Sequence, residues 1–78
     1  MIVYPNPTTG IVQLELSNNL RSGLDVVVFN EHGHVIKQQE NRKGNCIELD
    51  LRNCAAGDYF IRVYADDKVI TRKIKLEA

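Results

Sequence analysis

The sequence predicts an all-β domain in which about seven short antiparallel strands form a two-layered sandwich. Three observations favour this class. Eight Val, seven Ile and three Thr supply many β-branched side chains, which favour the extended backbone of a sheet. Apolar and polar residues alternate along several segments, and turn-forming residues recur about every 8–12 positions. No stretch keeps the period of about 3.6 residues that is typical of an amphipathic helix.

The chain opens with a short apolar strand, predicted at residues 2–4, and a turn rich in proline. Pro5 and Pro7 lack a backbone N–H and favour extended geometry in the residue before them, so this segment is neither helix nor central strand. Gly10 can supply a positive φ that closes the turn. From residue 11 to 17 apolar and polar residues alternate, which predicts a half-buried strand.

The middle of the chain predicts a central strand and a hairpin. Residues 18–23 form a polar connection. Residues 24–30 are apolar on both faces, which is typical of a strand near the centre of a sheet. Residues 30–33 are a hairpin turn that ends in a glycine with left-handed backbone conformation. We expect the return strand at residues 34–38 and a polar loop at residues 39–45.

The last part of the chain predicts three more strands, separated by two turns. Residues 46–51 alternate between apolar and acidic side chains, and residues 52–57 form a turn. Residues 58–65 are a longer alternating strand, and residues 66–67 are a two-residue acidic turn. The final strand covers residues 68–76, with isoleucines and a leucine on one side and lysines on the other.

Length and composition exclude several classes of function. The chain has 78 residues, enough for one domain but with little room for a deep catalytic cleft beside its core. Ten Lys and Arg balance ten Asp and Glu, whereas nucleic-acid-binding proteins normally carry a basic surplus. No apolar run reaches the roughly 18 residues of a transmembrane helix, and no signal-peptide pattern begins the chain. We therefore expect no nucleic-acid partner and no membrane insertion.

The sequence holds no catalytic or metal-binding pattern. Its two serines, Ser17 and Ser22, lack the context of a nucleophile. His32 and His34 flank a turn glycine next to Glu31, but a structural zinc site needs further Cys or His ligands. We expect two solvent-exposed turn histidines, no metal and no cofactor.

Two charged clusters are explained by strand geometry. Glu48 and Asp50 lie two residues apart on the polar face of one strand, without the loop of oxygen ligands that a calcium site uses. Arg72, Lys73 and Lys75 form a small basic patch. We interpret it as the solvated face of an edge strand, where lysines discourage pairing with other sheets, in preference to a specific anion site.

Cys46 and Cys54 leave two states open. The favoured state is two free thiols, with at least one buried as a small apolar side chain. The alternative is a disulfide, which an even cysteine count permits in a short extracellular domain. That bond would require the chain to fold back until the two Cα atoms are close.

Several motifs occur in a fixed order along the chain. The turn Tyr4-Pro5-Asn6-Pro7-Thr8-Thr9-Gly10 is followed by the apolar segment Val26 to Gly33, with its turn glycine, and by Val35-Ile36. The remaining members of the series are Leu49 to Leu51, Ala56-Gly57, Tyr59, Ile61 to Val63, Ile70 and Arg72-Lys73-Ile74. Together these motifs resemble the type A C-terminal sorting domains of the Bacteroidetes type IX (Por) secretion system, over essentially the whole chain.

The chain departs from that family's pattern at three places. Asp58 stands where the family usually has an apolar residue, and Cys54 takes a position commonly held by Leu. The end of the chain, Leu76-Glu77-Ala78, is less basic than is usual for the family.

The resemblance implies a secretion signal with an immunoglobulin-like fold and no enzymatic activity. Such a domain directs a periplasmic passenger protein through the type IX machinery and the outer membrane, to the cell surface or the medium. A sortase-like peptidase then usually removes it, and the passenger is attached to surface lipopolysaccharide. Residues 1–78 would be one sorting domain excised from the C-terminus of a larger secreted protein. Met1 would be an added start residue, and the cleavage site would lie upstream of Ile2.

The resemblance also suggests a recognition surface on the proline turn and on the last strands. Two prolines stiffen the turn, which lowers the entropy lost on binding, although the turn also simply joins two strands. The last strand offers backbone groups with which a partner strand could pair. The residues assigned to recognition are Pro5, Asn6, Pro7, Gly10, Gly57, Tyr59, Lys73 and Lys75.

Two other functions remain as alternatives. The chain could be a non-catalytic accessory module of a secreted protein, for carbohydrate binding or adhesion, or a homodimer that pairs edge strands. A sugar-binding face usually presents exposed aromatic platforms, and the chain has no Trp. We expect Phe29 and Tyr59 to lie inside, which leaves only Tyr4, Phe60 and Tyr64 for such a face.

Overall fold

Seven β-strands account for most of the computed structural model, which describes residues 1–16, 23–65 and 68–78. The strands are β1 (Ile2–Tyr4), β2 (Ile11–Glu15), β3 (Leu24–Asn30), β4 (Val35–Arg42), β5 (Cys46–Asp50), β6 (Gly57–Ala65) and β7 (Lys68–Leu76). All but β4 lie within two residues of their predicted bounds. The predicted acidic turn at residues 66–67 and all but residue 23 of the predicted connection at 18–23 lie outside the described residues. The part of the chain described contains no helix, and thus none long and apolar enough to cross a membrane.

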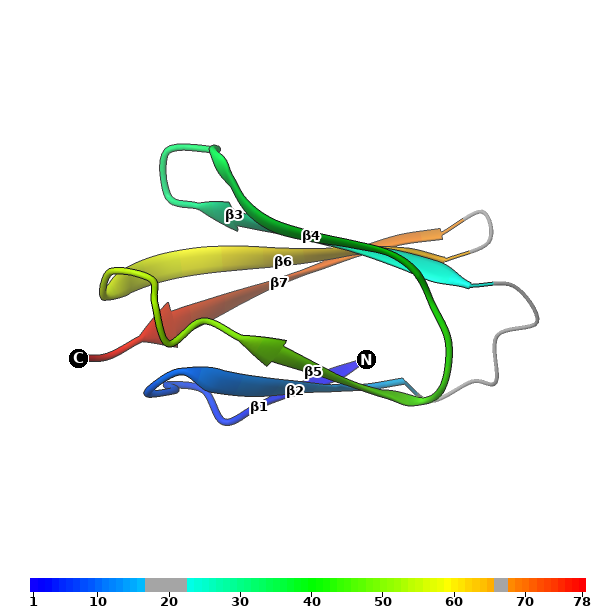
Figure 1. Cartoon of the computed structure of the whole chain (residues 1–78), viewed down its shortest axis with the longest axis horizontal. Helices are drawn as coiled ribbons and strands as arrows, with labels where there is room; N and C mark the ends of the chain where they lie inside the picture. The colour runs from blue at the N-terminus through cyan, green and yellow to red at the C-terminus, as the bar shows by residue number, and fades with distance from the viewer. Residues whose placement is uncertain (17–22, 66–67) are drawn as a thin grey trace.

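The strands form two antiparallel sheets, β1-β2-β5 and β4-β3-β6-β7, which face each other as a sandwich (Figure 1). If the strands are lettered A, B, C, C′, E, F and G in chain order, the sheets are A-B-E and C′-C-F-G. This is an immunoglobulin-like arrangement with the fourth strand added to the C-F-G sheet. The predicted fold class is therefore confirmed, and β3 is central in its sheet, as its two apolar faces predicted.

The core lies between the sheets and takes alternate residues from each strand. Strands β2 and β5 contribute Val12, Leu14, Ile47 and Leu49, all without exposed surface. The second sheet faces them with a larger apolar surface, because its strands are longer. Its buried core residues are Leu24, Val26, Val28, Tyr59, Ile61, Val63, Ala65, Ile74 and Leu76.

Strand β4 is longer than the sequence predicted, and the expected polar loop at residues 39–45 is wrong in its first half. Gln39 pairs with Val26 and Arg42 with Leu24, so the ladder continues through polar residues. An edge strand forms hydrogen bonds with one neighbour only, and its backbone needs no apolar side chains to do so. The apolar pattern therefore ends before the strand does.

Phe29 does not lie inside, contrary to the prediction. It pairs in register with Phe60 on the outer face of the second sheet, where both rings are half-buried. The Arg62 guanidinium lies over the Phe29 ring, 5.1 Å from its centroid. A strand with two apolar faces does not indicate which face meets the core, and here Val26 and Val28 do.

Candidate functional site

The predicted recognition residues gather at one end of the sandwich. The turn that follows β1 reaches the end of β7 and then returns into β2, so that it lies near the C-terminus (Figure 1). Strand β6 begins at the same end, because Gly57 pairs with Leu76. We call residues 5–8, 57–59 and 73–77 the end surface.

Asn6 joins the turn to the last strand through its side-chain amide. Its Nδ2 donates a hydrogen bond to the Lys73 carbonyl oxygen (3.2 Å), and its Oδ1 accepts one from the Lys75 backbone N–H (3.0 Å). The amide thus offers β7 one donor and one acceptor, as a neighbouring strand would. Pro5 and Pro7 flank it without an N–H to donate, so the side chain supplies pairing that this backbone lacks.

Thr8 continues the pairing and was not identified from the sequence. Its N–H donates to the Lys75 carbonyl oxygen (2.9 Å), and its own carbonyl oxygen accepts from the Glu77 N–H (2.8 Å). Its hydroxyl donates to the Ile11 carbonyl oxygen (2.8 Å) and accepts from the Gly10 N–H (3.1 Å). The side chain is buried, with 2% of the residue exposed. The available signal was a Thr two residues before a turn glycine, where a hydroxyl can bond to the turn backbone.

Gly10 is required by a close approach to Arg52. A Cβ atom at this position would lie 2.5 Å from the Arg52 Cγ and 3.4 Å from its Cα. The Gly10 carbonyl oxygen also accepts a hydrogen bond from the Leu51 N–H (2.8 Å), which ties the turn to the segment after β5. The role of Gly10 is therefore to let these two segments pack together.

Lys73 and Lys75 are exposed on the outer face of the second sheet. Lys73 Nζ lies 3.7 Å from Asp58 Oδ2, and Asp58 pairs in register with Lys75. The acidic residue that departs from the family pattern thus lies between two lysines and partly balances their charge.

Gly57 and Tyr59 lie at the start of β6, within the end surface. Tyr59 is buried, with 5% of the residue exposed, and its hydroxyl donates a hydrogen bond to the Ala55 carbonyl oxygen. Burial raises the pKa of this hydroxyl above its usual value. Tyr59 therefore holds the turn before β6 in place, and it lies inside the sandwich, as the sequence predicted.

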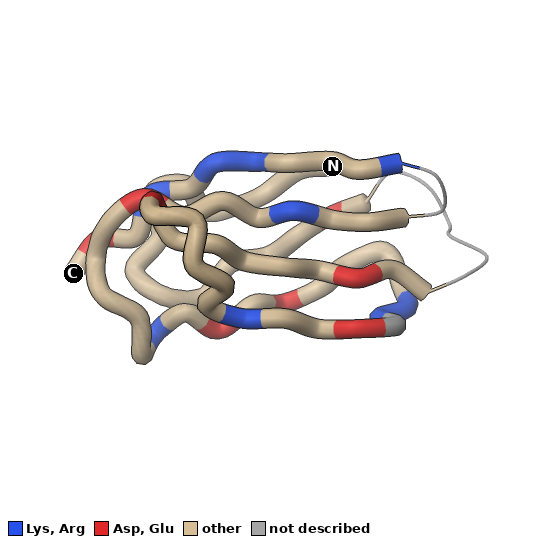
Figure 2. Tube along the Cα trace, turned by 90° about the horizontal axis from the view of Figure 1, so that it is seen from above, with Lys and Arg blue, Asp and Glu red and all other residues tan. Residues whose placement is uncertain are grey.

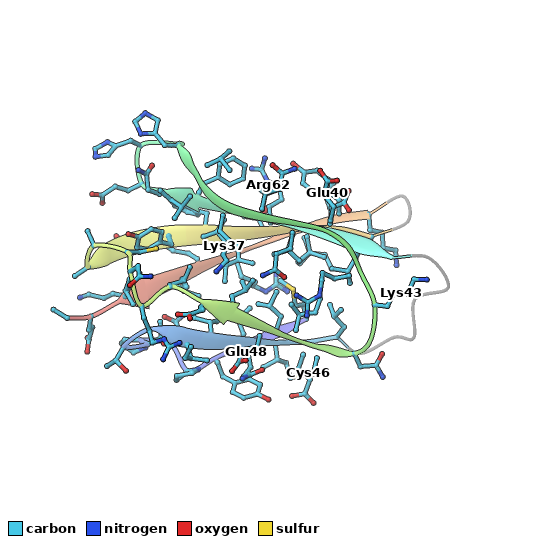
Figure 3. All side chains as sticks on the ribbon, viewed as in Figure 1. Lys37, Glu40, Lys43, Cys46, Glu48 and Arg62 are labelled. Atoms are coloured by element: carbon cyan, nitrogen blue, oxygen red, sulfur yellow. The ribbon has the colours of Figure 1, made fainter. Side chains whose placement is uncertain are left out.

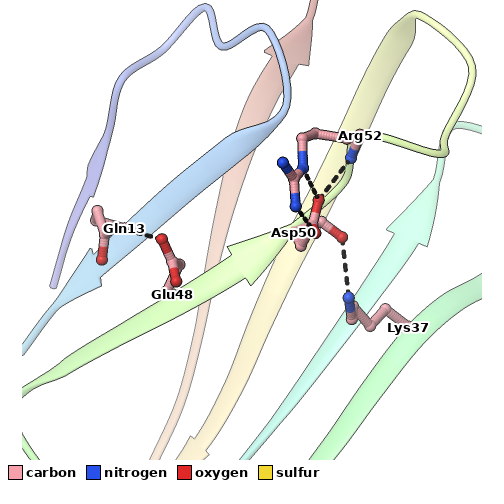
Figure 4. A network of polar contacts seen from close by, with 5 residues as sticks. All are labelled: Gln13, Lys37, Glu48, Asp50 and Arg52. Atoms are coloured by element: carbon pink, nitrogen blue, oxygen red, sulfur yellow. Dashed lines mark hydrogen bonds and ion pairs between the residues drawn. The ribbon is translucent and has the colours of Figure 1, made fainter.

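A second polar network closes the other side of the sandwich (Figure 4). The Asp50 carboxylate accepts hydrogen bonds from the backbone N–H, Nε and Nη2 of Arg52 (3.0, 2.9 and 2.7 Å). Lys37, on β4, donates from Nζ to the Asp50 carbonyl oxygen (2.9 Å) and so links the two sheets. The bonds from Arg52 hold the pKa of the Asp50 carboxyl well below its usual range. No local pattern in the sequence indicated these contacts.

A family model described as a secretion system C-terminal sorting domain matches residues 2–77. The chain belongs to this family. It is a non-catalytic secretion signal of the type IX (Por) system, as its motifs predicted. A comparison with curated proteins gave no match.

The zero net charge of the sorting domain conceals an uneven distribution between its sheets. Strands β1, β2 and β5 contain three acidic residues and no Lys or Arg. The other four strands contain seven basic and three acidic residues, a surplus of four positive charges. Four of the basic residues lie on β7, along one margin of the molecule (Figure 2). Arg62 extends from the second sheet on the side opposite to Cys46 and Glu48 (Figure 3).

The remaining candidate groups of the sorting domain stay apart. His32 and His34 are exposed, with ring centroids 6.2 Å apart. Within residues 1–16, 23–65 and 68–78, no three His, Cys, Asp or Glu side chains come together as metal ligands would. Both cysteines are free thiols: Cys46 is exposed beside Gln13, and Cys54 packs against the core. The alternative of a disulfide is not realised: Cys46 is exposed on β5, whereas Cys54 lies beyond the end of β5 and packs against the core.

Proposed function

We propose that the type IX secretion machinery recognises this sorting domain at its end surface. The observation that carries the proposal is the pair of hydrogen bonds between the Asn6 side chain and the β7 backbone. These bonds link Asn6 to Lys73 and Lys75, which follow it in the sequence by 67 and 69 positions. Through these bonds the proline turn and the basic end of β7 form one surface. Pro5, Asn6, Pro7, Lys73 and Lys75 would provide the contacts, since all are exposed.

The other assigned residues would act by positioning this surface. Gly10 admits the close packing of Arg52, and Tyr59 bonds to the turn that precedes Gly57. A surface held in this way is preorganised, so recognition would lose little conformational entropy. The lysines would supply electrostatic attraction that speeds the encounter and aids specificity.

The later steps follow from the family resemblance. We infer that the domain travels as the C-terminal part of a larger passenger protein. A sortase-like peptidase would cut upstream of Ile2 once the passenger has crossed the outer membrane. The passenger would then be attached to surface lipopolysaccharide or released to the medium.

A reporter fusion tests this function. The 78-residue chain is placed at the C-terminus of a periplasm-targeted fluorescent protein in a type IX-competent host, and the reporter is assayed in the periplasm, at the surface and in the medium. We expect export for the unaltered chain and for Lys43→Ala, which removes an exposed lysine from the β4–β5 connection. We expect periplasmic retention for the double variant Lys73→Ala/Lys75→Ala. Retention of the unaltered fusion, or normal export of the double variant, would refute the proposal.

A further inference from the structure

Strand β7 is the edge strand of its sheet, and one half of its outer backbone edge is already hydrogen-bonded to the proline turn. Asn6 and Thr8 bond to backbone groups of Lys73, Lys75 and Glu77, all of which point away from β6. Successive residues of a strand direct their backbone N–H and C=O groups to opposite edges. The odd-numbered residues of β7 therefore direct these groups away from β6, to the free edge of the sheet. The β6–β7 register is continuous from Lys68 to Leu76, so this alternation holds along the whole strand.

The other half of the same edge is open. By the alternation, Val69 and Thr71 direct their backbone N–H and C=O groups outward, and so does the N–H of Lys73. Among the described residues, the only hydrogen bond to these groups is a solvent-exposed one, from Arg72 Nη1 to the Thr71 carbonyl oxygen (3.0 Å). The Val69 residue is 59% exposed. The segment from Val69 to Lys73 is therefore a short pairing edge, ended on one side by Asn6.

The charges around this open edge decide what can pair with it. Lys68, Arg72 and Lys73 border it, and β7 contains no acidic residue. Antiparallel pairing of two copies about Thr71 would place Lys68 diagonally next to Arg72 of the second copy. It would also gather the cations of both strands along one junction without an acidic partner, which is unfavourable. A strand with acidic side chains would instead form favourable cross-strand pairs.

We propose that the β7 edge from Val69 to Lys73 accepts a short acidic strand from a protein of the secretion machinery. This inference rests on the proposed function above. The incoming backbone N–H replaces Arg72 as donor to the Thr71 carbonyl oxygen, and the released guanidinium pairs with a carboxylate of the added strand. The Asn6 amide limits the length of the added strand, because it occupies the next positions along the edge.

Peptide binding tests the inference directly on the 78-residue chain. The probe is an acetylated and amidated hexapeptide of alternating Glu and Val, titrated into isotope-labelled protein and followed by amide NMR. We expect binding with the largest shifts at the Val69, Thr71 and Lys73 amides, weakened by salt. A peptide of alternating Lys and Val should not bind. An acidic peptide with N-methyl groups on its pairing amides keeps its charges but cannot pair, and it should not bind either.

A matched pair of variants locates the site. Thr71→Pro removes an N–H that points away from β6, so it costs no bond of the β6–β7 ladder. Thr71→Val loses the same hydroxyl, which accepts from Arg62 Nε (3.3 Å), but keeps the N–H. We expect Thr71→Val to bind the acidic peptide normally. Thr71→Pro should bind it with an affinity lower by about tenfold or more, as the loss of an edge bond predicts. If Thr71→Pro fails to fold, the N-methylated peptide decides alone.

The outcomes separate this inference from the proposed function. Absence of binding, shifts elsewhere, or equal binding of the N-methylated peptide would overturn strand addition while leaving the end surface as the recognition site. Retention of the unaltered fusion in the periplasm would refute the proposed function by itself. Sedimentation of the free chain as a dimer, with Thr71→Pro monomeric, would overturn the choice of an acidic strand in favour of a second copy.

Discussion

Asn6 and Lys75, 69 positions apart, are joined by a 3.0 Å hydrogen bond from the Lys75 backbone N–H to the Asn6 side-chain oxygen. The bond places a side chain where a neighbouring strand would otherwise pair. Together with Thr8, it closes one side of the sandwich, as Lys37 and Asp50 link the sheets on the other. The proline turn therefore acts as part of the second sheet, although it connects two strands of the first.

Replacing Asn6 should weaken the fold by a modest amount. Asn6→Ala removes both bonds to β7, and we expect it to lower the free energy of unfolding by about 1 kcal/mol, since the contact is solvent-exposed. Asn6→Asp keeps the acceptor for Lys75 and should fall between Asn6→Ala and the unaltered chain. Urea denaturation measures the difference. Equal midpoints for Asn6→Ala and the unaltered chain would show that the bonds contribute nothing.

Thr8 should be more sensitive, because its hydroxyl is buried. Thr8→Val keeps the shape but leaves the Gly10 N–H and the Ile11 carbonyl oxygen without that partner. We expect a loss of about 1–3 kcal/mol in the free energy of unfolding, the usual cost of unsatisfied buried groups. Thr9→Val, at the exposed neighbouring position, is the control and should change the midpoint little. A similar effect from both variants would contradict the assigned role.

Gly10 and Arg52 should be energetically coupled. Gly10→Ala places a Cβ atom 2.5 Å from the Arg52 Cγ, and we expect it to destabilise the domain by about 1–3 kcal/mol, as overpacking does. Arg52→Ala removes that Cγ atom, so the double variant should lose less than the sum of the single changes. A double-mutant cycle in urea measures the coupling. Strict additivity would mean that the glycine is needed for its backbone conformation instead.

The bonds between Asp50 and Arg52 should make stability depend on pH in acid. The folded-state pKa of Asp50 lies below the unfolded value of about 3.9, so the contribution is present above that pH and is lost as the pH falls through the folded pKa. Thermal midpoints of the unaltered chain and Asp50→Asn should differ by a constant amount above about pH 5 and converge below about pH 4. Glu48→Gln controls for the loss of one surface carboxylate. A difference that stays constant down to pH 2 would exclude this ion pair as the cause.

Both cysteines should react as free thiols, but at different rates. Cys46 is exposed and should react rapidly with Ellman's reagent, whereas Cys54 packs against the core and should react slowly. Cys46→Ser should remove the fast phase and leave the slow one. Fewer than two reactive thiols per chain in denaturant, before any reduction, would reveal a disulfide.

Most strands could be predicted because their signal is local. In β5 and β6 the alternation of apolar and polar residues alone indicates the buried face, and Ile47, Leu49, Ile61 and Val63 are all buried as expected. The prediction failed where that signal is absent. Gln39 lies in a strand because β3 lies beside it, and Phe29 faces outward although its segment is apolar on both sides.

The fold class, the order of the strands along the chain and the family could all be predicted from the sequence, because alternation, turn residues and motifs are read within short segments. The pairing of the proline turn with the last strand could not be predicted in this way and was found in the folded chain. The same holds for the burial of Thr8 and for the division of the charges between the two sheets. A hydrogen bond such as that between Asn6 and Lys75 has no local pattern, because its two groups meet only when the packing of both sheets brings them together.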